Sequence, residues 1–293
     1  MTKLIPHNEN LCSKYATKML SIKINNVCNR SCSFCVDRGG RDGGCIDIEK
    51  IANEAIMLTD YATIIITGGE PFLNFDEVIV LATKLRKYKD RIVLNTNGTL
   101  LSKEKVEMLN GIIDELQVSI HHYDEDRHGK ILGGKVSFDN IKNSLENRDF
   151  MFSINSTFNN EYTEEEIPDA VDKMIELATY LKADRLRLTE LKKVGDSEFV
   201  SADKFFPKDN PALVRTSNEL ITDGCTYYYN KDGVDVSVKR LCAFAKGKNA
   251  PAFSCCFINT IGQKKIEVDT KDTFKVIYSD ALVTDDWVFD RNL

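Results

Sequence analysis

Long hydrophobic runs, a strong excess of one charge and biased tracts are all missing from this 293-residue sequence. No segment reaches the ~18 apolar residues that a membrane span needs, and residues 1–26 lack the continuous apolar core of a signal peptide. We therefore expect a cytoplasmic protein with no membrane partner. The formal net charge of −6 gives no broad positive field for a phosphate backbone, so large nucleic acids are weak candidates as partners.

The composition is that of a protein able to bury a core. Hydrophobic residues make up 42% and charged residues 29% of the chain, and disorder is not indicated. The length fits one large α/β domain, alone or with a small appendix. Nine cysteines would suggest disulfides in a small secreted protein, but this chain is neither small nor visibly secreted. In a reducing compartment, metal ligation explains a cluster of cysteines better than disulfide bonds do.

Apolar, β-branched segments alternate with segments of helical periodicity over the first two-thirds of the chain. Because parallel neighbours need a helical crossover, this alternation predicts an α/β fold of repeated βαβ units around a parallel sheet. Active sites in such folds lie at the carboxyl ends of the strands. We expect strands at Leu20–Asn25, Ala62–Thr67, Arg91–Asn95, Glu115–Ile120, Met151–Thr157 and Asp184–Glu190, and helices at Asp47–Leu58, Phe75–Lys87, Lys103–Leu109, Phe138–Glu146 and Thr163–Lys182.

The pattern changes after about residue 193 to short strand-like segments separated by glycine and proline. These segments lie at 226–229, 234–238, 264–268 and 274–278. They predict a small, mostly-β C-terminal extension. We therefore expect an N-terminal segment at 1–19, an α/β unit at 20–195 and an extension at 196–293.

Three cysteines, Cys28, Cys32 and Cys35, follow the first expected strand directly. Soft ligands on one short loop suit an iron–sulfur cluster or zinc. A fully ligated cluster or a tetrahedral zinc site needs four ligands, whereas three leave one iron open to bind a further molecule. The alternative is a structural zinc site completed by Cys45, although the C-x3-C-x2-C spacing departs from the paired C-x2-C halves of common zinc sites.

The motif C-N-x-x-C-x-x-C, with Phe34 before its last cysteine, resembles the signature of the radical S-adenosylmethionine (SAM) superfamily. A second element, Thr67-Gly68-Gly69-Glu70-Pro71, follows the second expected strand, where that superfamily carries its Gly-Gly-Glu-Pro element. The resemblance spans roughly residues 20–190. It implies a partial (β/α)6 TIM-like barrel, a [4Fe–4S] cluster on the three cysteines, and reductive cleavage of SAM to a 5′-deoxyadenosyl radical that abstracts hydrogen.

The resemblance also assigns residues to SAM. Gly68, Gly69 and Glu70 would contact its methionine end, since glycines expose backbone groups and a carboxylate can pair with an ammonium. Asn97 and Ser119, at the ends of the third and fourth strands, match positions where relatives place polar side chains against the SAM carboxylate or ribose. For both, local hydrogen bonding is the alternative.

Further polar residues follow the later strands. Arg187, with Arg185 on the same strand face, could bind the SAM carboxylate or an anionic substrate, or form ordinary salt bridges. The segment 121–129 holds three of the four histidines and is a candidate for contacting SAM or substrate. Its alternative is a charged, solvated loop.

Four cysteines crowd into the last third of the chain. In relatives of the SPASM and twitch type such extensions carry auxiliary iron–sulfur clusters, and four thiolates suit a fully ligated cluster. A zinc site and unligated thiols are the alternatives, because two of these cysteines are adjacent and would point opposite ways in extended chain. The four are Cys225, Cys242, Cys255 and Cys256.

The extension favours peptide modification within the family, with oxidation or rearrangement of a small sugar or nucleoside as the alternative. A zinc-organised binding module is the non-enzymatic alternative. The resemblance further implies a flavodoxin or ferredoxin-type reductant as a partner, beside the peptide or small-molecule substrate.

Overall fold

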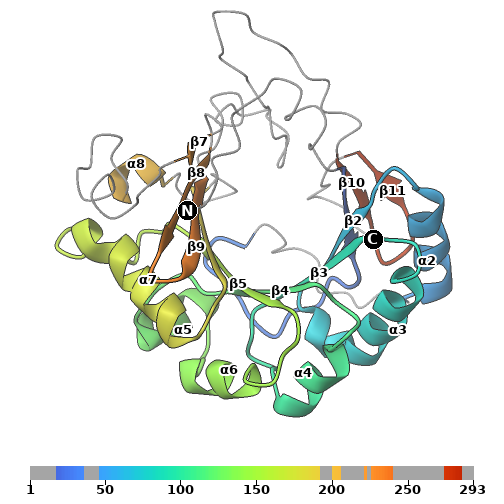
Figure 1. The fold of residues 1–293 in the computed structure, drawn as a ribbon, viewed down its shortest axis with the longest axis horizontal. Helices are drawn as coiled ribbons and strands as arrows, with labels where there is room; N and C mark the ends of the chain where they lie inside the picture. The colour runs from blue at the N-terminus through green and yellow to red at the C-terminus, as the bar shows by residue number, and fades with distance from the viewer. Residues whose placement is uncertain are drawn as a thin grey trace, which may run out of the picture.

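One curved sheet organises the protein. The structure, a computed structural model, describes residues 18–35, 46–191, 200–205, 221–222, 226–239 and 274–285. Within them an eleven-stranded sheet has the order β11-β10-β1-β2-β3-β4-β5-β6-β9-β8-β7. Figure 1 shows the sheet bent into an open trough, with β7 to β9 at one rim and β10 and β11 at the other. The sheet is therefore a partial barrel.

Six strands form the centre of the sheet, and each pairs in parallel with the next. All six lie where the sequence predicts them, which confirms the α/β class. They are β1 (Met19–Lys23), β2 (Thr63–Thr67), β3 (Arg91–Thr96), β4 (Glu115–Ser119), β5 (Met151–Thr157) and β6 (Arg185–Thr189).

Helices connect these strands and cover the outer side of the trough (Figure 1). Side-chain caps fix where several of them begin. Asp47 accepts a hydrogen bond from the Lys50 N–H (3.0 Å), and Ser102 accepts one from the Lys105 N–H (3.3 Å). The α-helices are α2 (Ile48–Met57), α3 (Phe75–Leu85), α4 (Lys103–Leu109), α5 (Glu125–Leu132), α6 (Phe138–Ser144), α7 (Ala170–Tyr180) and α8 (Ala202–Phe205), with 3-10 turns η1 (Pro71–Asn74) and η2 (Ile167–Asp169).

The helix expected from Thr163 begins later than predicted. The Thr163 N–H donates to Glu166 Oε2 at 2.8 Å, so this contact of the predicted capping box forms. A 3-10 turn that contains Pro168 follows, and regular helix starts only at Ala170. The cap signal was correct, but it introduces a turn before the helix.

The two faces of the sheet differ in chemistry. Side chains such as Ile22, Ile64, Leu116 and Ile154 are 0% exposed beneath the helices. The alternate side chains face the inside of the trough and are largely polar, because successive residues of a strand point to opposite faces. The core therefore lies between the sheet and its helices, and the inner face is left for polar ligands.

One expectation is corrected. The segment 121–129 was expected to be a loop, but its second half lies in α5 (Glu125–Leu132). Asp124 caps this helix by accepting from the Arg127 N–H at 2.9 Å, and Gly133 ends it with φ of 73°. The acidic residues Glu125 and Asp126 form the first turn of a helix, where carboxylates interact favourably with the helix dipole.

The described C-terminal strands extend the same sheet. β8 (Thr226–Lys231) and β9 (Val234–Lys239) form a hairpin, and β9 pairs in parallel with β6. On the other side, β10 (Phe274–Ile277) pairs in parallel with β1 and in antiparallel with β11 (Val283–Thr284); β7 is Ile221–Thr222. The expected strand at 264–268 lies outside the described residues, and the division at 195/196 stays a prediction. In the described part of the chain, no helix has the length and apolar character needed to cross a membrane.

Candidate functional site

The cluster loop, residues Cys28–Cys35, leaves the carboxyl end of β1. Within it the Cys35 N–H donates to the Cys32 carbonyl (3.1 Å). Two donors approach the Cys28 sulfur, the Arg30 N–H at 3.4 Å and Asn97 Nδ2 at 3.9 Å. Hydrogen bonds to sulfur are one means by which proteins tune iron–sulfur clusters.

The three thiols are close enough to oppose one another's ionisation. Burial, together with the charges of Cys35 and Cys28, raises the pKa of Cys32 to about 12. The pKa of Cys28 is also raised, chiefly by burial and in addition by Glu70. Because a metal binds the thiolate, this arrangement needs positive charge from the bound group, which iron supplies. The donor set thus fits a cluster.

Among the described residues, no three His, Cys, Asp or Glu side chains are grouped to hold a single metal ion. A cubane cluster makes a different demand, since each thiolate binds its own iron. Cys45, the proposed fourth ligand of the zinc alternative, lies outside the described residues. So do Cys225, Cys242, Cys255 and Cys256, and the auxiliary cluster stays a prediction.

Gly68 and Gly69 let the end of β2 lie directly against the chain that enters the cluster loop. A Cβ on Gly68 would stand 2.6 Å from Asn25 Oδ1, and one on Gly69 would stand 2.2 Å from the Val27 carbonyl oxygen. In the native contact the Gly69 N–H donates to the Asn25 carbonyl at 3.0 Å. The two glycines therefore serve backbone packing; their contact with SAM stays a prediction.

Glu70 is 1% exposed and links the ends of β2 and β3. Its Oε1 accepts from the Phe72 N–H (3.0 Å) and the Thr96 hydroxyl (2.7 Å), and its Oε2 accepts from the Asn97 N–H (2.7 Å). Burial raises the pKa of this carboxyl, and the three hydrogen bonds oppose that effect. The sequence did not reveal these partners, because they depend on tertiary contacts.

Asn97 lies against the start of the cluster loop. Its Nδ2 donates to Asn29 Oδ1 at 2.9 Å as well as approaching the Cys28 sulfur, and its Oδ1 accepts from the Thr99 N–H at 3.0 Å. The structure therefore places this side chain at the site. The described contacts are with the loop, and its predicted contact with SAM stays untested.

Ser119 and Arg187 lie in one row on the inner face. The strand register joins Ser119 to Asn155, Asn155 to Arg187 and Arg187 to Ser237. All four are partly exposed, whereas the neighbouring Val118, Ile154 and Leu186 are buried on the outer side. This row places hydroxyl, amide and guanidinium groups together near the carboxyl ends of four strands, which suits an anionic or polyhydroxyl ligand.

A second inner-face group, unforeseen from the sequence, surrounds Glu115, which is 0% exposed. Its carboxylate accepts from the Ser153 hydroxyl (2.6 Å) and Gln117 Nε2 (2.9 Å), pairs with Arg91, and lies 3.8 Å from Arg185 Nη1. Although burial acts to raise the pKa of Glu115, these hydrogen bonds lower it below its usual value. The sequence offered one signal for this group, which is the charged residue Glu115 at the start of a buried strand.

The histidines of segment 121–129 are buried, contrary to the solvated alternative. His121 is 7% exposed, and His122 and His128 are 0% exposed. Each accepts a backbone N–H at Nδ1, from Thr157 (3.1 Å), Asp124 (2.9 Å) and His121 (3.3 Å), respectively. The neutral rings therefore carry their proton on Nε2.

We expect the stability of the metal-free protein to fall with pH below about 6.5. Burial lowers the pKa of His121 and His122 to about 4. Between these values the unfolded chain binds protons that the folded chain does not, so each histidine destabilises the fold as pH falls, by on the order of 1–3 kcal/mol. The raised pKa of Glu70 acts in the opposite direction. Urea unfolding at about pH 7 and about pH 4.5 measures the difference.

His122→Phe is the matched variant for that measurement. The ring of His122 stacks on Tyr162 with centroids 4.3 Å apart, and phenylalanine retains a stacking ring but cannot titrate. The variant should lose less stability than the parent over the same pH interval. Equal losses would mean that His122 does not contribute to the pH dependence.

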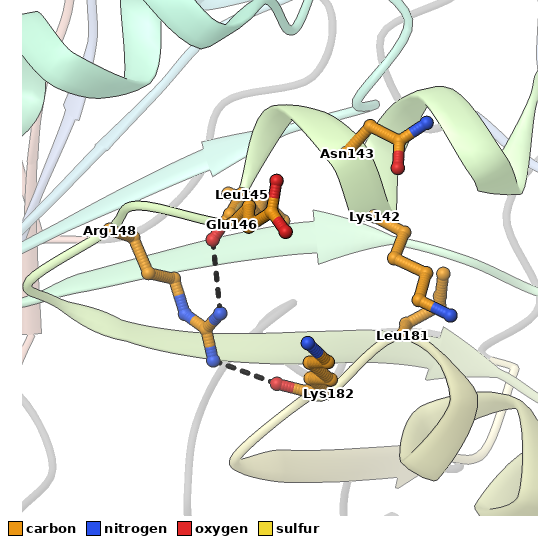
Figure 2. Close-up of a pocket in the computed structure, with 7 residues that line it drawn as sticks. All are labelled: Lys142, Asn143, Leu145, Glu146, Arg148, Leu181 and Lys182. Atoms are coloured by element: carbon orange, nitrogen blue, oxygen red, sulfur yellow. Dashed lines mark hydrogen bonds between the residues drawn. The ribbon is translucent and has the colours of Figure 1, made fainter.

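A small surface pocket, lined by residues that include Arg148 and Lys182 (Figure 2), lies before the amino ends of β5 and β6. Arg148 donates there to the Leu145 carbonyl (3.2 Å) and the Lys182 carbonyl (2.7 Å). These bonds tie together the turns that precede the two strands. We assign this pocket to the stability of the barrel, because activity in such folds lies at the other end.

A sequence profile of the radical SAM superfamily matches residues 22–174, which include the cluster loop and the contacts of Gly69 and Glu70. The chain belongs to the radical SAM superfamily. It is therefore an enzyme that uses a [4Fe–4S] cluster and SAM, and the zinc-organised binding module is excluded as its function.

Curated relatives differ in their named reactions. The chain is 31% identical over 176 residues to a "Probable GTP 3′,8-cyclase" of Methanocella arvoryzae, with 57% of this chain and 55% of the relative covered. It is 26% identical over 279 residues to an "AdoMet-dependent heme synthase" of Methanosarcina barkeri, with 85% and 76% covered. The match thus spans little more than half of the first relative.

Solved structures of radical SAM enzymes share the fold. Streptococcus suis SuiB bound to S-adenosylmethionine gives a TM-score of 0.64 at 17% identity, with 94% of this chain and 64% of SuiB covered. SuiB bound to its precursor peptide SuiA gives 0.60 at 16% identity, with 94% and 63% covered. At these identities the likeness establishes the partial barrel.

Proposed function

We propose that Cys28, Cys32 and Cys35 bind three irons of the [4Fe–4S] cluster and leave the fourth iron for SAM. The observation that carries this proposal is the grouping of three thiols on one loop. The start of this loop, at Cys28, packs against Gly69 and contacts Asn97. When bound, the cluster would supply the electron for reductive cleavage of SAM, and the resulting 5′-deoxyadenosyl radical would take hydrogen from the substrate. The chain's own residues position the two cofactors and the substrate.

SAM would extend from the cluster loop across the strand ends. Gly68–Glu70 and Asn97 would lie at its methionine end, beside the loop they already contact. Ser119 and Arg187 would meet its ribose or carboxylate, because both belong to one partly exposed row of the inner face. A hydroxyl and a guanidinium suit those groups.

For the substrate we propose a peptide. Support comes from the fold shared with SuiB, which was solved with its precursor peptide and matches over 94% of this chain. The C-terminal cysteines would hold an auxiliary cluster, and a flavodoxin or ferredoxin-type protein would donate the electron.

A nucleotide is the second candidate, and a specific observation favours it. Arg91, Arg185 and Arg187 all project from the inner face of the trough, where guanidinium groups could bind phosphates. A relative named as a probable GTP 3′,8-cyclase is 31% identical over 176 residues, 57% of this chain. Arg91 and Arg185 already flank Glu115, so a phosphate would share them with this carboxylate.

We expect the anaerobically reconstituted protein to contain iron and to release 5′-deoxyadenosine with dithionite and SAM. The substrate is then tested by its effect on that release and by the mass of the product. Candidate peptides encoded beside this protein and GTP are compared at equal concentration. Stimulation and a mass change with a peptide support the first candidate, and the same result with GTP supports the second. No iron and no 5′-deoxyadenosine would contradict the cluster assignment.

A further inference from the structure

The cluster loop rests on a segment far away in the sequence. We call residues Ile131–Lys135, at the end of α5 and just beyond it, the platform. The Ser31 N–H donates to the Leu132 carbonyl (3.0 Å), and the Ser33 N–H donates to the Ile131 carbonyl (3.2 Å). Both donors lie between the first and last ligand cysteines, so the platform holds the middle of the loop.

Side chains and glycines complete this contact. Arg30 Nη2 donates to the Lys135 carbonyl at 2.8 Å. A Cβ on Gly133 would stand 2.3 Å from Ser31 Oγ, and one on Gly134 would stand 2.5 Å from Arg30 Nη1. At these two positions only glycine, which has no Cβ, can approach the loop this closely.

The platform is itself anchored to the barrel. His128, one turn earlier on α5, is 0% exposed, stacks on Phe138 (5.6 Å between centroids) and accepts the His121 N–H. Arg127 forms an ion pair with Glu166. These contacts involve neither the loop nor any ligand, so the platform keeps its position independently of metal.

The aromatic residue of the loop makes the last contact. Phe34 packs edge-on against His121, with centroids 4.9 Å apart. His121 follows β4 directly, so the loop is fixed at its third ligand as well as at its centre. The ordering of the loop therefore comes from protein contacts on two sides.

We propose that the platform holds the cluster loop in its ligand-binding conformation before iron arrives, and so sets how well the cluster is retained. The proposal rests on the assignment of Cys28, Cys32 and Cys35 as the ligands. A loop already ordered in the apo protein loses less conformational entropy on binding metal. Residues 131–135 act as positioning residues, because their hydrogen bonds are with Arg30, Ser31 and Ser33 of the loop.

Gly133→Ala tests this, with Gly111→Ala as its matched control. The two glycines have nearly equal φ, 73° and 72°, so alanine strains the backbone equally. A Cβ on Gly111 would meet nothing within 4 Å, whereas one on Gly133 would meet Ser31. The difference between the variants therefore isolates the contact with the cluster loop.

Two measurements are made. In the apo protein, the Ser31 and Ser33 amides should exchange hydrogen slowly in the parent and in Gly111→Ala, and about tenfold or more faster in Gly133→Ala. In the reconstituted protein, iron loss to a chelator should accelerate by a similar factor in Gly133→Ala alone. Equal behaviour of the two glycine variants would overturn the proposal.

The double variant Gly133→Ala/Ser31→Ala checks that the clash is the cause. Removing Ser31 Oγ leaves the new Cβ with its nearest contact at 3.3 Å, so slow exchange and iron retention should largely return. A failure to recover would contradict the proposal. If Gly133→Ala does not fold, Arg30→Ala takes its place, with a smaller acceleration expected.

Failure of the ligand assignment would look different. It would show as an iron content that does not fall, by about four per chain, when all three cysteines are replaced, whereas failure of the platform proposal leaves that result unchanged. The exchange measurement on apo protein does not depend on the cluster at all.

Discussion

Cys32→Ala should remove about four irons per chain and reduce 5′-deoxyadenosine release below detection. The pKa of the Cys32 thiol is raised to about 12 by burial and by its neighbours Cys35 and Cys28. Loss of one ligand leaves two cysteines, which cannot hold a cubane with one open iron. Iron analysis, visible absorbance and EPR of the anaerobically reconstituted protein measure the effect.

Ser33→Ala is the control in the same loop. Its side chain is exposed, and its hydrogen bond to the platform uses the backbone N–H, which alanine keeps. This variant should bind iron and cleave SAM as the parent does. If Cys32→Ala retained its iron, or if Ser33→Ala lost it equally, the assignment of the ligands would be wrong.

Replacing all three loop cysteines also tests the auxiliary cluster. With a second cluster on Cys225, Cys242, Cys255 and Cys256, the parent should contain about eight irons and the triple variant about four. About four irons in the parent and none in the variant would remove the auxiliary cluster. Only the loop cysteines should be needed for SAM cleavage.

The sequence was sufficient for the barrel and for the cluster loop because both depend on local patterns. Apolar residues alternate along each central strand, and their spacing predicted all six strands close to their final bounds. The three cysteines lie within eight residues, so the loop could be recognised before any tertiary contact was known. Ser102 and Asp47 likewise cap the predicted helices.

The helix α5 was missed although local signals for it exist. Asp124 before two acidic residues is a helix start, and Gly133 nine residues later is a helix end. The histidines and charges between them suggested a solvated loop. Burial of His128 against Phe138 stabilises the helix. The sequence does not show this contact, because it depends on how α5 packs on the rest of the barrel.

Long-range partners could not be predicted from the sequence. Glu70 was expected to face the SAM ammonium, and nothing local indicates that its carboxylate also accepts hydrogen bonds from Thr96 and Asn97, at the end of the next strand and just after it. The same holds for the platform, which is about a hundred residues from the loop it supports. Parallel sheets bring such segments together only after the strands have paired.

Glu70→Gln should weaken SAM binding about tenfold or more and also change the EPR spectrum of the reduced cluster without SAM. The amide keeps one acceptor oxygen for Phe72 and Thr96, but its NH2 group then faces the Asn97 N–H, and a buried hydrogen bond is lost at a cost of about 1–3 kcal/mol. Asn97 would shift, and with it the contact of Nδ2 with the Cys28 sulfur.

Thr96→Val is the control, because it removes the hydrogen bond to Glu70 Oε1 and leaves both the carboxylate charge and the bond to the Asn97 N–H. It also removes the hydrogen bond that the Thr96 hydroxyl accepts from the Gly98 N–H (3.1 Å). It should leave the SAM-free spectrum unchanged.

The two readouts, SAM affinity and the EPR spectrum without SAM, separate two roles of Glu70. A weaker SAM affinity with an unchanged SAM-free spectrum in Glu70→Gln would mean that the carboxylate acts on SAM directly. A change in both means that it also acts through Asn97 on the cluster loop, and this is the result we expect because Oε2 already holds the Asn97 backbone.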